Sequence, residues 1–187
     1  NSMSEILNPG EMRIMLKWPK TNPVTGEDLD SHLQIPDNAN STFHIMYSLT
    51  KKKYYYATDN YTCPSCSSDQ QSDNVTIDKD SQTVPGDETI TISSVRSGTY
   101  SFSVHNISDR DNSSITNLGQ SGAKVKVIYC PLGADCSKEE SVVRKKFSVP
   151  NTNGTLWRVF TFNSSDSGDG FTERRVMTYE YDPEDVY

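Results

Sequence analysis

The stretch Asp28-Leu29-Asp30-Ser31-His32-Leu33 has a period of two, and its two sets of side chains differ in chemistry. In an extended strand successive side chains point to opposite faces, so the leucines share one face and Asp28, Asp30 and His32 share the other. Two carboxylates this close repel each other unless a cation lies between them, and calcium or an Arg or Lys side chain is the usual partner. The stretch therefore predicts a core strand that carries an acidic site.

The same alternation of apolar and polar residues runs along most of the chain, and helical periodicity is almost absent. The segments that it predicts as strands are 11–18, 28–33, 43–49, 75–80, 89–93, 99–105, 123–129, 142–149, 155–162 and 176–181. We predict an all-β protein, an antiparallel two-sheet β-sandwich of jelly-roll or immunoglobulin-like type with nine to ten strands. The segments 142–149 and 155–162 are expected to pair around the turn at 151–154, and 58–71 is expected to be a polar loop.

Size and charge narrow the class of protein. The chain has 187 residues, 18 basic and 25 acidic, with a formal charge of −7, which argues against nucleic-acid binding and against an anionic membrane surface. No apolar run approaches the ~18 residues of a membrane span. We expect residues 1–10 to be a tag remnant and lead-in, 11–181 to be a single domain, and 182–187 to be a frayed tail. The expected unit is a monomeric module of a larger protein.

A second acidic element, Val75-Thr-Ile-Asp-Lys-Asp80, repeats the spacing of the first, and Glu88 stands at the start of the next strand. Calcium takes six to eight oxygen ligands, and the two elements together supply most of them. The residues predicted to hold Ca²⁺ are Asp28, Asp30, Asp78, Asp80 and Glu88. The alternative is that Asp28 and Asp30 are exposed and hydrogen-bond nearby polar groups without a metal. His32 is a poor calcium ligand and is expected to hydrogen-bond a neighbour.

The four cysteines form two local pairs, Cys63 with Cys66 and Cys130 with Cys136. We predict a disulfide within each pair, because neither needs long-range geometry. A redox-active Cys-x-x-Cys would open a helix in a βαβ unit, which this sequence does not offer, and the second spacing is loose for a zinc site. Both of these alternatives remain open.

Seven Asn-x-Ser/Thr triplets exceed the roughly three expected by chance, which suits an exported glycoprotein, although polar loops of a bacterial protein would give the same pattern. The candidate glycosylation sites are Asn40, Asn60, Asn74, Asn106, Asn112, Asn153 and Asn163. The candidate ligand-binding aromatics are Tyr54, Tyr55, Tyr56 and Tyr61. The lysines at 51–53 before them are interpreted as a solvated strand edge.

Several blocks in one order resemble the YfaP-type domain of exported bacterial proteins. They are Met12–Trp18, Asp28–Leu33, Ile77–Asp80, Asp87–Ile92, Gly98–His105, Ser121–Val127, Phe147–Pro150, Gly154–Phe160 and Met177–Tyr179. The first block is also similar to pre-peptidase C-terminal domains, in which an Asp-x-Asp strand holds the metal. The chain departs from the pattern at Ser81, where acidic residues are usual, at Gly86-Asp87 in place of Gly-Pro, and in both cysteine loops.

The resemblance implies a non-catalytic, secreted or cell-surface accessory or adhesion module that binds glycan or protein or acts as a spacer. The sequence contains no Gly-x-Ser-x-Gly, His-Glu-x-x-His or P-loop motif, so we expect no enzymatic activity. The alternative is an accessory domain of a hydrolase, or a weak hydrolase that uses Asp28, Asp30 or Asp78 as acid or base.

Overall fold

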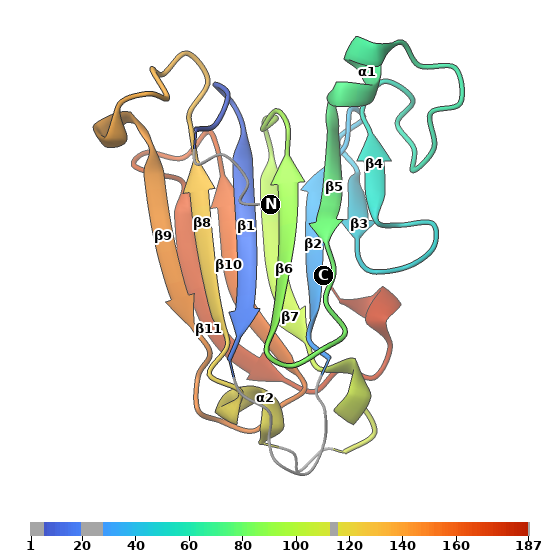
Figure 1. The fold of residues 1–187 in the computed structure, drawn as a ribbon, viewed down its shortest axis with the longest axis vertical. Coiled ribbons are helices and arrows are strands. Elements are labelled where there is room, and N and C mark those ends of the chain that lie inside the picture. Colours follow the sequence, from blue (N-terminus) through green and yellow to red (C-terminus); the bar gives the residue numbers. More distant parts are fainter. Residues whose placement is uncertain (1–5, 20–27, 113–115, 187) are drawn as a thin grey trace.

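The computed structural model describes residues 6–19, 28–112 and 116–186, and within them eleven strands form two antiparallel sheets (Figure 1). The strands are β1 (Met12–Trp18), β2 (Asp30–Pro36), β3 (Thr42–Ile45), β4 (Lys53–Tyr55), β5 (Asn74–Lys79), β6 (Gly86–Ile92), β7 (Thr99–His105), β8 (Lys124–Tyr129), β9 (Val143–Ser148), β10 (Leu156–Asn163) and β11 (Phe171–Thr178). The order is β4-β5-β6-β1-β8-β9 in the six-stranded sheet and β11-β10-β7-β2-β3 in the five-stranded sheet. The predicted two-sheet β-sandwich is confirmed.

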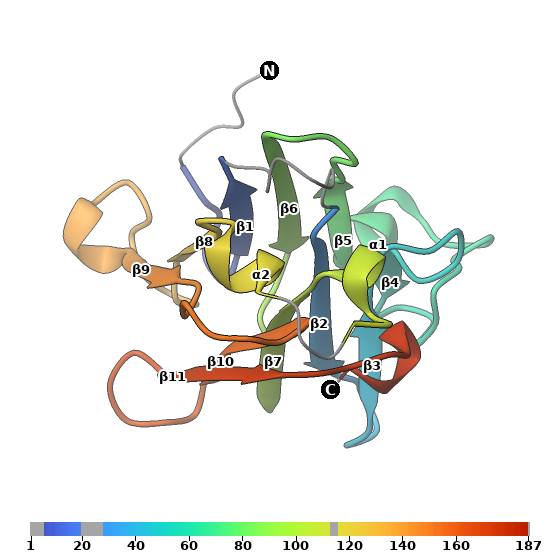
Figure 2. The same ribbon diagram turned by 90° about the horizontal axis from the view of Figure 1, so that it is seen from below.

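The two sheets pack as two layers (Figure 2), and the alternating pattern of each strand places one set of its side chains between them. In β1 the residues Met12, Ile14, Leu16 and Trp18 are at most 1% exposed, whereas Lys17 lies on the other face. Aromatic rings fill the space between the sheets, and the Phe160 ring from β10 stacks on both Phe102 and Phe147. Because Phe102 belongs to the five-stranded sheet and Phe147 to the six-stranded sheet, this stack joins the two layers.

The prediction that 142–149 and 155–162 form a hairpin is wrong. β9 pairs with β8 at the edge of the six-stranded sheet, and β10 lies between β7 and β11 in the other sheet. Every second side chain of β9 is exposed, as suits an edge strand, whereas β10 is mostly buried and has partners on both sides. The turn at 151–154 therefore carries the chain from one layer to the other.

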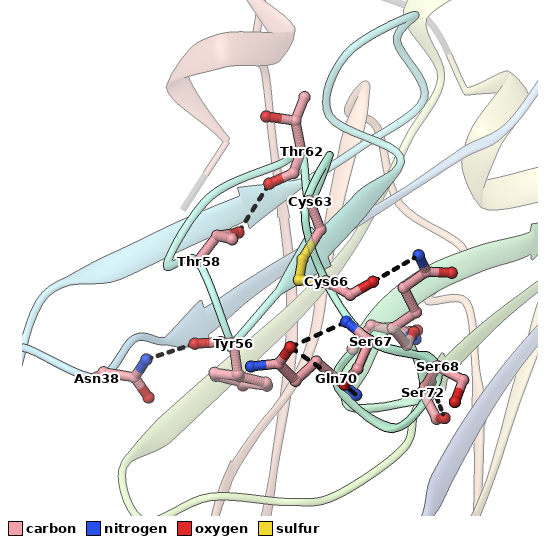
Figure 3. Close-up of a disulfide and its surroundings, with 12 residues drawn as sticks. Asn38, Tyr56, Thr58, Thr62, Cys63, Cys66, Ser67, Ser68, Gln70 and Ser72 are labelled. Atoms are coloured by element: carbon pink, nitrogen blue, oxygen red, sulfur yellow. Dashed lines mark hydrogen bonds between the residues drawn. A yellow bond between two sulfur atoms is a disulfide. The ribbon is translucent and has the colours of Figure 1, made fainter.

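The loop at 58–71 is shorter and more ordered than predicted, because its end forms the helix α1 (Ser68–Ser72). Figure 3 shows the Cys63–Cys66 disulfide just before the helix. Ser67 caps the helix, and its backbone N–H donates to Gln70 Oε1 at 2.9 Å. The side chain of Asn38 donates to the Tyr56 carbonyl at 2.8 Å and links this loop to the residues after β2 (Figure 3).

The second predicted disulfide, Cys130–Cys136, also forms. It pins a loop over one end of the outer face of the six-stranded sheet, by which we mean the face turned away from the core. A small apolar cluster of Leu7, Ile128 and Cys130 lies under this loop, with Met15 packed against it. This loop does not cover the other end of the outer face, where residues of β1, β8 and β9 line a groove.

The C-terminal tail, expected to be frayed, is ordered up to Val186. Residues Pro183–Asp185 form a 3₁₀ turn, η3, and Val186 is only 2% exposed. The tail is held by Lys51, which forms an ion pair with Glu184, and by His105, whose Nε2 lies 3.0 Å from the Glu180 carbonyl oxygen. The described residues include two short helices, α1 and α2 (Asn117–Gln120), and no helix among them is long and apolar enough to cross a membrane.

Candidate metal centre between the two sheets

Three carboxylates, two from strands and one from the residue that follows a strand, meet at one end of the sandwich. Asp30, Asp80 and Glu88 each offer an oxygen atom, and these oxygen atoms all lie within 4.8 Å of one another. Asp30 is the first residue of β2 in the five-stranded sheet, whereas Asp80 follows β5 and Glu88 lies in β6 of the six-stranded sheet. The acidic site that we call the carboxylate cluster therefore joins the two sheets.

A hydrogen bond between the sheets fixes the position of Glu88. The backbone N–H of Ser31 donates to Glu88 Oε2 at 2.8 Å, so the start of β2 is tied to β6 across the core. Figures 1 and 2 both show the start of β2 beside the end of β5 and the start of β6. This hydrogen bond holds Ser31 and Glu88 together, although they are 57 positions apart in the sequence.

The prediction that Asp78 belongs to this site is wrong. The pairing of β5 with β6 shifts between Ile77 and Lys79, so that Ile77 lies opposite Ile90 and Lys79 opposite Thr89. This β-bulge inserts one extra residue, Asp78, which turns to the outer face, where it is hydrogen-bonded by Thr91 and lies near Arg13. Asp80, two residues after Asp78, lies close to Glu88. A spacing of two therefore does not put Asp78 and Asp80 on one face here.

Burial leaves the cluster with oxygen atoms that have no partner. Glu88 is 1% exposed and Asp30 is 7% exposed, while Asp80 is the least buried of the three. Glu88 Oε1 and Asp30 Oδ2 have no hydrogen-bond partner, and neither has Oδ1 of the neighbouring Asp28. A buried carboxylate without a partner is costly, so these atoms need a proton or a cation.

The pKa values of these carboxyl groups are raised, which is consistent with a need for a proton or a cation. Burial, followed by the charges of Asp28 and Asp80, raises the pKa of Asp30 to about 7. Burial also raises the pKa of Glu88 well above its ordinary value, with Asp30 and Asp80 adding to the effect. The pKa of Asp28 is raised by burial and by Asp80. The charges that contribute most to these pKa shifts are all negative, and neither a lysine nor an arginine of the described residues is among them.

The donor set suits a hard cation. Asp30, Asp80 and Glu88, with Asp28 beside them, offer carboxylate oxygen atoms, which are the ligands that calcium prefers. Calcium takes six to eight oxygen atoms, and carboxylates bind it through one or both oxygens. Four of the five predicted ligands therefore lie near one another, and only Asp78 does not.

Three histidines form a second buried cluster that the sequence analysis missed. His32 Nδ1 and His44 Nε2 are 2.9 Å apart and share a proton, as predicted for His32, and the His105 ring lies edge-on to the His32 ring at 5.5 Å. Burial lowers the pKa of all three, to about 4 for His44, so they are neutral at pH 7. Pairing of β2 with β3 and β7 brings them together, and that register was the missing information.

The predicted ligand-binding tyrosines are mostly part of the core. Tyr54 is fully buried and Tyr56 is 4% exposed, so neither ring can stack on a ligand. Arg96 covers the Tyr56 ring at 3.9 Å, and Tyr61 packs edge-on against Phe43. Tyr55 is half-buried beside Lys53. The aromatic run thus stabilises the sheet edge, because alternate rings enter the core.

Two of the candidate glycosylation sites are inaccessible in the folded chain. Asn106 is fully buried and Asn74 is 8% exposed, so neither presents its amide to an enzyme. Both sit at strand ends where side-chain amides satisfy backbone or carboxylate groups, as Asn106 does for Asp109. Exposed side chains are found at Asn40, Asn60, Asn112 and Asn153, and Asn163 is half-buried.

Comparison with known proteins gives no functional assignment. No protein-family model matches the chain, and neither does any of the curated proteins searched. One solved structure, titled "Crystal structure of unknown function protein SAV2460", is similar to the chain with a TM-score of 0.49 and 14% identity, over 93% of this chain and 91% of that chain. The resemblance to YfaP-type domains therefore stays a prediction.

Proposed function

We propose that this chain is a non-catalytic β-sandwich module of an exported protein, and that it binds one calcium ion at Asp28, Asp30, Asp80 and Glu88. The observation that carries the proposal is the buried Glu88 Oε1, which has no partner and belongs to a group of three carboxylates whose oxygens lie within 4.8 Å. A cation there offsets the repulsion between the carboxylates and supplies the missing partner.

The ion would act as a clamp between the layers. Asp30 lies in the five-stranded sheet, and Asp80 and Glu88 lie in or beside strands of the six-stranded sheet. Coordination of both sides by one ion joins β2 to β5 and β6 at the end of the sandwich that the Ser31 to Glu88 hydrogen bond already links. The two local disulfides support an oxidising, extracellular environment, where millimolar calcium sites are common.

Burial favours this role over the hydrolase alternative. A general acid or base must reach the substrate within hydrogen-bond distance. Asp30, one of the residues considered for that chemistry, is only 7% exposed and lies against Glu88, which is 1% exposed, so it has no open path to a polymeric substrate. Asp78, one of the residues considered for that chemistry, lies on the outer face away from the cluster.

Calcium titration followed by thermal unfolding tests the proposal. If the dissociation constant is about 0.1 mM, then about 5 mM calcium adds roughly 2 kcal/mol to the free energy of unfolding, which raises Tm by about 4–9 °C. We expect a smaller shift with magnesium, because its strict octahedral geometry suits a preformed carboxylate group less well.

The matched control is Asp78→Asn, which removes a carboxylate from the same acidic element but outside the cluster. This variant should keep the full calcium response. An unchanged Tm of the parent chain at millimolar calcium, measured near pH 8 where protons compete least, would rule the site out.

A further inference from the structure

The part of the outer face of the six-stranded sheet away from the Cys130–Cys136 loop carries four lysines and, among the described residues that line the same groove, a single acidic residue, Asp87. Lys17 in β1, Lys124 and Lys126 in β8, and Lys146 in β9 line one groove of about 1000 Å³ on this face. Among the residues that the structure describes, none forms an ion pair with any of the four. We call these residues the lysine face. Its charge is opposite to the net charge of −7 of the whole chain.

The lysines are placed directly opposite one another across the sheet. The register pairs Lys17 with Lys124, and Lys126 with Lys146. Like charges that face each other across neighbouring strands are destabilising. An ordinary solvated sheet face mixes both signs of charge, whereas this one concentrates a single sign over three adjacent strands. The nearest acidic residue, Asp87, is opposite Lys17 but forms its ion pair with Lys79.

Protection of a sheet edge does not explain the arrangement. Lysines on an edge strand discourage unwanted pairing, and Lys146 in β9 fits that role. Lys17, Lys124 and Lys126 lie in β1 and β8, which have partners on both sides. Three of the four cations therefore remain to be accounted for, and an anionic partner accounts for them.

We propose that the lysine face binds a linear acidic polysaccharide through its carboxylate or sulfate groups. Neighbouring strands are about 4.8 Å apart, so a polymer that crosses β1, β8 and β9 meets lysines at regular intervals. The proposal concerns a different surface from the calcium site and does not depend on it.

Two features of the groove favour a polysaccharide over other polyanions. Single-stranded nucleic acid needs exposed aromatic rings on which bases stack, and the aromatic residues of the groove, Trp18 and Phe147, are 0% and 6% exposed. An acidic peptide that added its backbone to the sheet could pair only with the free edge of β9 on this side, and it would not cross β1 and β8, which carry three of the four lysines. A polysaccharide requires neither stacking nor backbone pairing.

The test is a binding titration of the whole chain with polygalacturonate and heparin at low salt, with dextran as the neutral control. We expect binding to the two acidic polymers that weakens steeply as salt is raised, and none to dextran. The variant Lys124→Ser/Lys126→Ser should weaken binding about tenfold or more. The control Lys52→Ser/Lys138→Ser, which makes the same change in net charge elsewhere, should have little effect.

Unfolding measurements separate loss of binding from loss of structure. Because the lysine pairs repel each other, the Lys124→Ser/Lys126→Ser variant should melt at the parent temperature or higher. Absence of binding to both acidic polymers would overturn the proposal, and so would an equal loss in the two double variants. Equal, lysine-face-dependent binding of single-stranded DNA or polyglutamate would overturn the choice of a polysaccharide.

Discussion

Strand β2 carries two buried titratable clusters that solve the same physical problem in opposite ways. Asp30, at its start, belongs to the carboxylate cluster, and His32, two residues later, belongs to the histidine cluster. The histidines become neutral by losing a proton, and two of their ring nitrogens then bond to each other. The carboxylates have no such partner and must gain a proton or a cation. His32 Nε2 and His105 Nδ1 have no hydrogen-bond partner either, but a neutral imidazole carries no charge that needs compensation, whereas an ionised carboxylate does. Burial of like groups therefore points to a missing cation only where the groups would otherwise carry charge.

The pH dependence of stability should differ in sign between the clusters. The pKa of Asp30 is raised to about 7 in the folded chain, so its contribution to stability is present at low pH and is lost as pH rises toward 7. The pKa of His44 is lowered to about 4, so its contribution is present above its ordinary pKa of 6.5 and is lost as pH falls toward 4.

Removal of one charge from the carboxylate cluster should have the largest effect. In Glu88→Gln the amide oxygen still accepts from the Ser31 N–H, and the amide nitrogen can donate to Asp30 or Asp80. We expect the calcium-dependent rise in Tm to disappear. We also expect the calcium-free variant to gain roughly 1–3 kcal/mol at pH 8, because an unsatisfied buried group is removed. Denaturant unfolding with and without calcium measures both effects.

A Glu88→Gln variant that is less stable than the parent at pH 8 in a chelator would show that the calcium-free cluster is not under electrostatic strain. That result would contradict the inference that the carboxylate cluster lacks a partner and needs a proton or a cation.

A smaller effect is expected from the histidine cluster. In His44→Gln the side chain can still hydrogen-bond His32, but it no longer titrates. The calcium-saturated variant should lose about 1–2 kcal/mol less than the parent between pH 6.5 and pH 5, after allowance for the partial exposure of His44. Lys51, which lowers the pKa of His44, and Glu184, which raises it, are unchanged in this variant. Identical acid unfolding curves would show that His44 does not contribute.

The alternation of apolar residues was enough to predict the two-sheet sandwich, because period two is a property of each strand alone. Alternation does not predict that β9 and β10 belong to different sheets, because the choice of sheet depends on the strands with which each one pairs. The spacing of acidic residues also predicts that Asp28, Asp30, Asp80 and Glu88 share one site. The exclusion of Asp78 depends on a single β-bulge, and the histidine cluster depends on cross-strand register. Neither the bulge nor the register can be predicted from the spacing of residues within one strand.

The pH dependence of stability with and without calcium tests the central claim most directly, which is that the carboxylate cluster holds either protons or a cation. In a chelator the free energy of unfolding should fall between pH 5 and pH 8, with Asp30 alone contributing about 2.5 kcal/mol. In calcium that fall should largely disappear, and the gap between the two curves should widen as pH rises. Two curves that coincide throughout this range would contradict the account.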